Sequence, residues 1–410
     1  MAAITSVWNI RGSEMIGVNS GTVKLSSTER VRFGQPTAQA LAEELELSQA
    51  KGVMVIASQS LASTTDEIAN VEKALGERHA VTFTGVAPHV PHSDVIAAAN
   101  VAREYSADLI VSIGGGSVTD CAKLVPFCLS NDLRSTEALA DYHIRVGQDG
   151  TIINPANQPL FNPQTVRTIC IPTTLSGGEF NSLSGSTDAV SMHKHLYEHR
   201  MMAPVTVILD PGLSRHTPEW LFLSTGVRAL DHAIETLQSF QSNDYCDGLA
   251  DSALRLLVEG LPRVKADPGD LEARLKCQVG VWQSMLPVIS GVPMGASHAI
   301  GHVLGGLCAV PHGYTSCVMS PAVLWWNASV NGERQKRIAA AFGEPGTPAG
   351  DLVAAFISAL KMPRALSAVN VTEDQFPAIA EYTMQDIWSR TNPREITGPS
   401  DLLEILVSAK

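Results

Sequence analysis

Four histidines in the second half of the chain have the spacing of a shared chemical site. His298 and His302 are four residues apart in GASHAIGHVLGG, so both imidazoles project from one face if the segment is helical. His312 follows a glycine-rich stretch and a proline, which can return the chain to the same place. Imidazoles bind metal ions and exchange protons near neutral pH. The cluster predicts either a metal site or a site of acid–base chemistry.

The fourth histidine lies upstream, in GVRALDHAIET (226–236). Apolar residues recur there at spacings of three and four, which predicts an amphipathic helix. Arg228, His232 and Glu235 form a polar stripe roughly 100° around that helix from the apolar one. Asp231 lies on another side and can pair with Arg228 at the i, i+3 spacing.

A glycine turn in the first half has the pattern of a phosphate site. In VSIGGGSVTDCAKL (111–124) an apolar strand leads into three glycines, Ser117 and a helix. Glycines let a phosphate approach the backbone, and the N-terminus of a helix offers unpaired N–H groups. A plain tight turn is the alternative. The second turn, PTTLSGGEFN (172–181), suits a ribose or a nicotinamide amide, or is simply a polar loop.

Alternating segments predict the elements that carry these turns. Strands are predicted at 52–58, 80–86, 108–115, 166–174 and 205–211, and helices at 37–48, 66–78 and 93–106. A long polar connection is predicted between about 131 and 166. After Pro211 helical patterns dominate: 218–240, 244–264, 269–289, 294–308, 333–342, 349–361 and 372–389. We therefore expect an α/β dinucleotide-binding domain with a parallel sheet over 1–212, then an all-α domain over 213–410.

Composition narrows the class of protein. The 410 residues carry a formal net charge of −12, which disfavours nucleic acid as a partner. Seven scattered cysteines fit reduced thiols, and no signal peptide or membrane span is recognisable. We expect a cytoplasmic enzyme with a small-molecule substrate.

Taken in order, these stretches resemble the iron-containing alcohol dehydrogenase superfamily. VRFGQPTAQALAEELE is similar to its opening strand and helix, GGGSVTDCAK to its pyrophosphate turn, and PTTLSGGEFN to its nicotinamide-side loop, with Lys194 and Asp210 as the next landmarks. GVRALDHAIE and HAIGHVLG with PHG are similar to its two metal-ligand segments. The resemblance covers nearly the whole chain and implies hydride transfer between NAD(P)(H) and an alcohol–carbonyl pair, in a cleft between two domains of a dimer or larger homo-oligomer.

The resemblance also implies residue roles. Those on the cofactor would be Gly115, Gly116, Ser117, Thr173, Thr174 and Lys194. Ser58 stands where NAD-preferring members carry Asp at the adenosine ribose; because a serine does not repel a 2′-phosphate, NADP(H) is admitted beside NAD(H). His232, His298 and His312 would face a divalent metal such as Fe or Zn, and His302 would relay a proton beside the substrate.

Arg228 departs from this pattern, because metal-binding members have an Asp four residues before the first histidine. At 4 Å, two unit charges interact by roughly 4 kcal/mol at an effective dielectric of 20, and a divalent ion doubles that. Arg228 therefore opposes a metal, although three histidines alone can bind zinc. The short TTLSGGE spacing is similar to that of maleylacetate reductases, whereas PHG is more like the metal enzymes.

Two enzymatic hypotheses follow. In the first, Arg228 binds a substrate carboxylate and His302 or His298 supplies the proton, as in a metal-independent reductase of a carbonyl or unsaturated oxo acid. In the second, the chain is a metal-dependent dehydrogenase of small alcohols. A third possibility is a dinucleotide-binding protein without turnover. Arg228 pairing only with Asp231 or Glu235 is the alternative to a role in substrate binding.

Overall fold

The computed structural model describes residues 22–147, 151–159, 161–191 and 193–410. They form two compact units, one over 25–216 and one over 217–410 that also includes 22–24. The N-terminal segment 1–21, where no signal peptide is predicted, lies outside the described residues. Among the described helices, none combines the length and apolar character needed to cross a bilayer.

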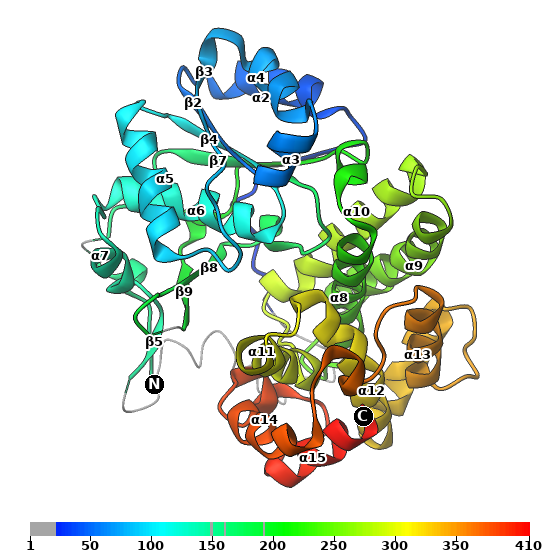
Figure 1. Cartoon of the computed structure of the whole chain (residues 1–410). Coiled ribbons are helices and arrows are strands. Elements are labelled where there is room, and N and C mark those ends of the chain that lie inside the picture. The colour runs from blue at the N-terminus through cyan, green and yellow to red at the C-terminus, as the bar shows by residue number, and fades with distance from the viewer. Residues whose placement is uncertain (1–21, 148–150, 160, 192) are drawn as a thin grey trace. The chain divides into compact units, whose positions relative to one another are not determined.

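A six-stranded parallel sheet forms the centre of the first unit (Figure 1). Every strand pair in it is parallel, as the alternation of strand and helix predicts. In spatial order the strands are β1 (Arg30–Phe33), β10 (Thr206–Leu209), β7 (Arg167–Pro172), β4 (Leu109–Gly114), β2 (Val53–Ala57) and β3 (His79–Phe83).

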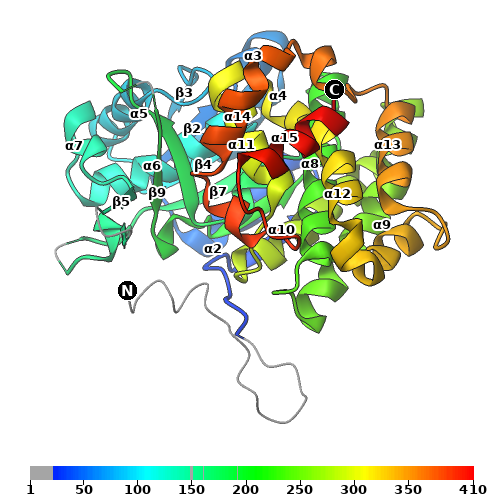
Figure 2. The ribbon, with the colours of Figure 1, turned by 90° about the horizontal axis from the view of Figure 1, so that it is seen from below.

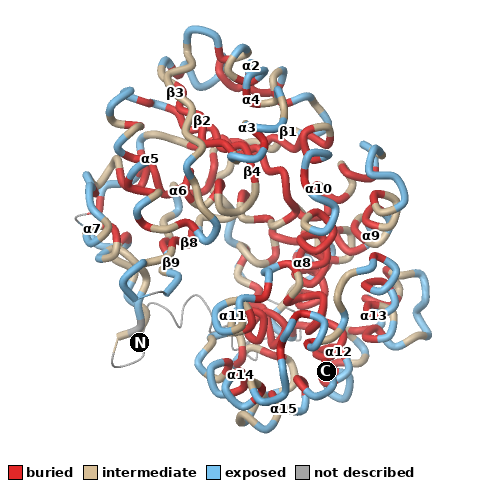
Figure 3. The backbone as a smooth tube through the Cα atoms, viewed as in Figure 1, coloured by how far each residue is buried: buried red, intermediate tan, exposed pale blue. Residues whose placement is uncertain are grey.

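Both faces of this sheet are covered by helices. Along β2, Val53 and Val55 belong to one apolar cluster and Met54 and Ile56 to another, so alternate side chains point to opposite faces. Figure 3 shows β2 and β4 buried along their length. The helices of this unit are α2 (Thr37–Ser48), α3 (Gln59–Thr64), α4 (Glu67–Leu75), α5 (His92–Glu104), α6 (Gly116–Ser130) and α7 (Thr136–Ala140).

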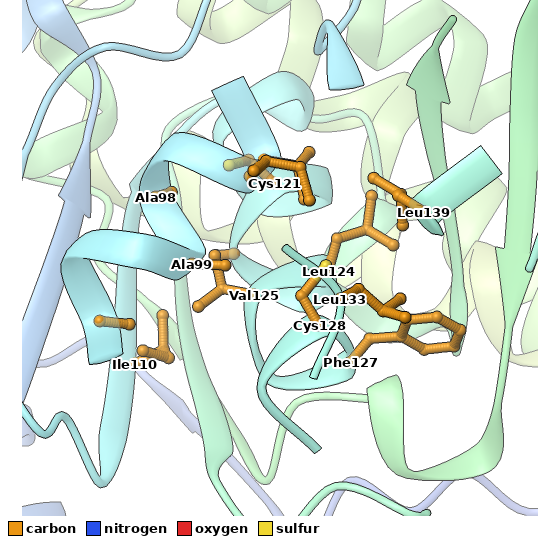
Figure 4. Close-up of a cluster of buried hydrophobic side chains, with 14 of the residues drawn as sticks. Ala98, Ala99, Ile110, Cys121, Leu124, Val125, Phe127, Cys128, Leu133 and Leu139 are labelled. Atoms are coloured by element: carbon orange, nitrogen blue, oxygen red, sulfur yellow. The ribbon is translucent and has the colours of Figure 1, made fainter. Parts of the chain in front are cut away.

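Small residues bring α5 and α6 close to the sheet. In Figure 4, Ala98 and Ala99 of α5 face Cys121 and Val125 of α6, with Ile110 of β4 beneath them. All five side chains are buried. Because α6 packs this closely, its first turn is held firmly at the end of β4, where the glycine turn lies.

The order of the strands creates a switch point beside that turn. The chain passes from β2 outward to β3 and then returns to β4 on the other side of β2. In open α/β sheets, ligands bind at the carboxyl ends of strands where the winding direction changes. Ser58 follows β2 and Gly115 follows β4, so both border this point.

Two short hairpins extend the first unit. They are β5 (Arg145–Val146) with β6 (Ile152–Ile153), and β8 (Leu183–Thr187) with β9 (Lys194–Glu198). The connection predicted as irregular between 131 and 166 thus contains α7, β5 and β6, and the hairpin of β8 and β9 is absent from the sequence prediction.

The described elements of the second unit are α-helices and short 3-10 helices. Its helices are α8 (Glu219–Gln238), α9 (Asp244–Ala266), α10 (Leu271–Ile289), α11 (Ala296–Cys308), α12 (His312–Ala341), α13 (Ala349–Ala359), α14 (Phe376–Thr383) and α15 (Pro399–Ser408). Every residue of α8 from Phe222 to Gln238 is buried, so α8 is the central helix. α11 packs beside α14, and α14 beside α15 (Figure 2).

The fold class predicted from the sequence is confirmed: a parallel α/β unit precedes a helical one. Four helices were predicted incompletely or missed, and α3 and α7 are two of those missed. Only 333–342 is predicted within α12, which begins at His312, continues through Pro321 and bends at Asn331. The C-terminal helix α15 is not predicted, although Pro399 in its first turn is a typical helix start.

A histidine cluster lies between α5 and the hairpin of β8 and β9. The Tyr197 hydroxyl and His92 Nε2 are 2.9 Å apart, and both side chains are buried. The His143 and His195 rings stack with centroids 3.9 Å apart, and the His195 centroid lies 5.2 Å from that of His92. Burial, reinforced by neighbouring His195, lowers the pKa of His92 from 6.5 to about 4.

This pKa predicts a loss of stability in mild acid. Between pH 6.5 and about 4 the unfolded chain protonates His92 but the folded chain does not, so the free energy of unfolding should fall as the pH falls through that window. Urea unfolding measured across it should show a weaker pH dependence for His92→Gln than for the unaltered chain. The exposed His89→Asn variant is the control; an equal flattening there would contradict the assignment to His92.

Candidate active site

Three neighbouring strand ends bring together most residues assigned to the cofactor. Ser58 follows β2, Gly115 follows β4 and Thr173 follows β7. The Ser58 N–H donates to the Ile113 carbonyl over 2.9 Å, and the Thr173 N–H donates to the Gly114 carbonyl over the same distance. These bonds hold the two loops against the glycine turn, so residues far apart in sequence border one site.

The glycine turn lets the loop after β7 approach the start of α6 closely. A Cβ added at Gly115 would lie 3.1 Å from Thr174 Cγ2, and one at Gly116 would lie 3.4 Å from Ser176 Oγ. Gly115 is the N-cap of α6, and no side chain caps this helix end. The first N–H groups of α6, including that of Ser117, are thus offered to an anion by the backbone. The residues present fit a dinucleotide.

Lys194 reaches the same helix from the hairpin. Its Nζ lies 3.6 Å from Asp120 Oδ2 on α6, and its side chain is half exposed. Asp210 has a different role. It accepts hydrogen bonds from the N–H and hydroxyl of Thr37 at 2.7 and 2.8 Å and from the Gly212 N–H at 2.8 Å. Asp210 therefore fixes the start of α2 to the end of β10.

In the helical unit, Arg228 of α8 is a buried cation. Its Nη1 donates to the hydroxyls of Thr315 and Ser316 on α12, at 3.3 and 3.2 Å. Gly301 of α11 makes room for this contact, because a Cβ there would lie 2.9 Å from Thr315 Oγ1. Arg228 forms no ion pair within the described residues, so the predicted pairing with Asp231 or Glu235 is not found.

Glu235 of α8 instead binds the start of α11. It accepts hydrogen bonds from the N–H groups of Gly295 and Ser297, both at 2.9 Å, and lies 2.7 Å from His298 Nδ1. Gly295 is the N-cap of α11 and has no side chain to cap it. Glu235 therefore caps α11 from a different helix and fixes the His298 ring.

The four histidines form two pairs. The His232 and His298 ring centroids are 4.8 Å apart, while those of His302 and His312 are 6.2 Å apart with nearly parallel rings. His302 Nδ1 lies 2.8 Å from Asp386 Oδ2. His232 and His298 are buried, whereas the His302 side chain is 40% exposed.

Burial dominates the electrostatics of the group. It raises the pKa of Asp231 and of Glu235 to about 7, so both carboxyls titrate near neutral pH. It lowers the pKa of Arg228 to about 10, which leaves the guanidinium charged. Burial, with the charge of Arg228 contributing, holds the pKa values of His232 and His298 well below 6.5. Both imidazoles are therefore neutral.

A divalent metal does not fit this arrangement. In the described part of the chain, no three His, Cys, Asp or Glu side chains are grouped so as to hold a metal ion. The Arg228 cation lies one turn before His232 on α8, where its charge opposes a divalent ion. The ligand set of His232, His298 and His312 implied by the resemblance finds no support in the geometry.

Comparison with known proteins agrees with the fold. The model of the family described as iron-containing alcohol dehydrogenase matches residues 28–211, and that of the C-terminal part of the same family matches 222–409. The chain belongs to the iron-containing alcohol dehydrogenase family. It is accordingly an oxidoreductase.

Relatives in this family include dehydrogenases and reductases. Dehydrogenase FUM7 of Gibberella moniliformis is 32% identical, over 94% of this chain and 96% of its own. Maleylacetate reductase of Sphingobium indicum is 28% identical, over 90% and 92%. The crystal structure of maleylacetate reductase from Agrobacterium tumefaciens, 25% identical, superposes with a TM-score of 0.78 over 95% of this chain and 98% of that one.

The roles of three residues that hold the two candidate sites in place are not predicted from the sequence. Lys123 and Asp386 are not singled out at all, and Glu235 is considered only as an ion-pair partner. A lysine inside an apolar helix is a usable signal for Lys123. Asp386 has no local signal, because it meets His302 from 84 residues away.

The cap on α11 predicts a loss of stability in Glu235→Gln. The amide nitrogen of glutamine cannot accept a hydrogen bond, so at least one buried N–H loses its partner. We expect the free energy of unfolding to fall by about 1–3 kcal/mol in urea titrations. The control is Glu259→Gln, which alters an exposed carboxylate that pairs with Lys276. Equal stability of the two variants would contradict the capping role.

Proposed function

We propose that the chain is an NAD(P)(H)-dependent oxidoreductase whose small substrate carries a carboxylate beside the reacting carbon. The reacting group is a carbonyl–alcohol pair or an unsaturated oxo acid, as the likeness to maleylacetate reductases suggests. The first unit would bind the dinucleotide and the second the substrate. A homodimer or larger assembly is part of this proposal.

The buried cation of Arg228 carries the proposal. A buried charge is expensive unless a partner of opposite charge or several hydrogen bonds compensate it. In the described residues the guanidinium bonds to two neutral hydroxyls and to no carboxylate. A substrate carboxylate would supply the missing charge, and the planar guanidinium suits its two oxygens.

His298 and His302 are the residues we propose for the substrate hydroxyl and its proton. In each ring Nδ1 lies against a carboxyl group, which leaves Nε2 for the substrate. His298 Nε2 is buried without a hydrogen-bond partner, which suits an alcohol hydroxyl as donor. His302, partly exposed and paired with Asp386, would pass the proton to or from solvent.

A nicotinamide dinucleotide would supply the hydride or accept it. Gly115, Gly116 and Ser117 would hold its pyrophosphate, and Thr173, Thr174 and Lys194 would line the rest. Ser58, at the end of β2, carries no charge that would exclude a 2′-phosphate. This supports the use of NADP(H) as well as NAD(H).

Replacing Arg228 tests the substrate class. For an oxo-acid substrate, Arg228→Met should raise KM about 10- to 100-fold, because a hydrogen-bonded charge contact is lost. KM for an uncharged aldehyde or ketone of similar size should change little. Steady-state kinetics on the two substrates provide the comparison.

Arg274→Met is the matched control for this experiment. Arg274 is also a buried arginine of the helical unit, but it stacks on Phe222 and donates to the Pro268 carbonyl instead. It should leave the ratio of the two KM values unchanged. An unaltered KM for the oxo acid in Arg228→Met would refute the substrate-binding role.

Chelation separates this proposal from a metal-dependent alcohol dehydrogenase. Because Arg228 opposes a divalent ion, we expect activity to be unchanged after dialysis against a strong chelator, and metal analysis to find less than one Fe or Zn per chain. Activity that disappears on chelation and returns with Fe²⁺ or Zn²⁺ would favour the metal enzyme. Cofactor binding without turnover on any substrate would indicate a protein that has lost catalysis.

A further inference from the structure

Lys123 is a buried lysine that the proposed chemistry does not use. It lies on α6, two turns after the glycine turn, and is 1% exposed. Its Nζ donates to the Gly178 carbonyl at 2.9 Å, to Asn181 Oδ1 at 3.1 Å and to the Leu183 carbonyl. An ammonium has three N–H groups, so these acceptors satisfy all of them.

These bonds fix one wall of the cofactor site. The three acceptors all belong to 178–183, the segment that follows Thr173 and Thr174 and leads into β8. The pyrophosphate turn and the nicotinamide-side loop are thus joined through a single buried ammonium. A displacement of either segment would leave that ammonium without its acceptors.

Asp120 connects the same helix to Lys194. Asp120 Oδ1 accepts a hydrogen bond from the Ser184 hydroxyl at 3.2 Å and lies 3.7 Å from Lys123 Nζ. Its other oxygen, Oδ2, lies 3.6 Å from Lys194 Nζ. Asp120 thus holds the ammonium groups of Lys123 and Lys194 close to the first turn of α6.

Gly185 sets the path of the Lys194 side chain. It lies on β8, across the hairpin from the strand that carries Lys194. A Cβ at this position would lie 2.0 Å from Lys194 Cε and 2.8 Å from its Nζ. The lysine therefore crosses the hairpin over a space that only glycine leaves open, and this path directs its ammonium to Asp120.

We propose that Asp120, Lys123 and Gly185 are positioning residues that hold Lys194 and the 178–183 segment for the dinucleotide. This inference rests on the proposed function, because Lys194 is taken as a cofactor contact. None of the three needs to touch the cofactor: Asp120 and Gly185 act through Lys194, and Lys123 acts through the loop.

A double-mutant cycle on cofactor affinity tests the proposal. The dissociation constants of NADH and NADPH, measured by fluorescence titration, should rise about tenfold in Asp120→Asn and in Lys194→Met. If Asp120 acts through Lys194, the double variant should bind no more weakly than Lys194→Met alone. Effects that multiply to about a hundredfold would overturn the link between the two residues.

Gly185→Ala provides a second, independent measurement. It removes no charge and no hydrogen-bonding group, and the flexible end of Lys194 can move aside. We expect weaker cofactor binding in Gly185→Ala, but no further weakening when it is combined with Lys194→Met. Unchanged cofactor affinity in Gly185→Ala would overturn the role of Gly185.

The control is Glu46→Gln, which removes an exposed ion pair with Arg78 in the same unit and should leave cofactor affinity unchanged. Failure to bind either dinucleotide by the unaltered chain would overturn the proposed function and this inference together. Normal binding by the unaltered chain and by Asp120→Asn, Lys194→Met and Gly185→Ala would overturn the inference alone.

Discussion

The helical unit depends on providing hydrogen-bond partners for four ionisable side chains of one helix that are almost completely buried. α8 is buried on every side from Phe222 onward, yet it carries Arg228, Asp231, His232 and Glu235. The surrounding helices provide hydrogen-bond partners for these side chains: hydroxyls, backbone N–H groups and the His298 ring. The acids are bonded to neighbours other than the arginine. In the described part of the chain the Arg228 guanidinium therefore bonds to hydroxyls and to no carboxylate, which is the basis of its proposed contact with a substrate.

The candidate cofactor site at α6 and the candidate substrate site at α8 would contact their ligands through different groups. At α6 the ligand would bind to backbone N–H groups at the helix N-terminus, and the glycines would let it approach them. Around α8 the contacts are side chains whose orientations are fixed by other side chains, such as Glu235 on His298 and Asp386 on His302. The ligand affinity of a site built from backbone groups changes little when residues other than its glycines are substituted. A side-chain site is sensitive to each partner, so specificity can change there without altering the fold.

Sequence reasoning recovers features that have a local period. The strands around the glycine turn are apolar runs, and His298 and His302 share a helix face by spacing alone. The β8–β9 hairpin was not predicted, because its buried residues include Ser184, Ser186 and Tyr197. Its sequence therefore lacks the alternation of apolar and polar residues that is typical of a half-buried strand. The cap from Glu235 joins positions about sixty residues apart, and no window of sequence contains both. Contacts across helices are thus the part that only coordinates reveal.

The three strand ends that border the glycine turn have a consequence for how this unit matures. β2, β4 and β7 pair in parallel, so each must wait for the crossover segment that precedes it, and loop closure of this kind is slow. No fragment short of β7 contains the complete border of the turn. A nascent chain that ends before β7 therefore lacks Thr173 and Thr174. A bound dinucleotide would stabilise only the complete sheet and would slow its cooperative opening. Amide hydrogen exchange would detect this as slower exchange in each strand of the sheet.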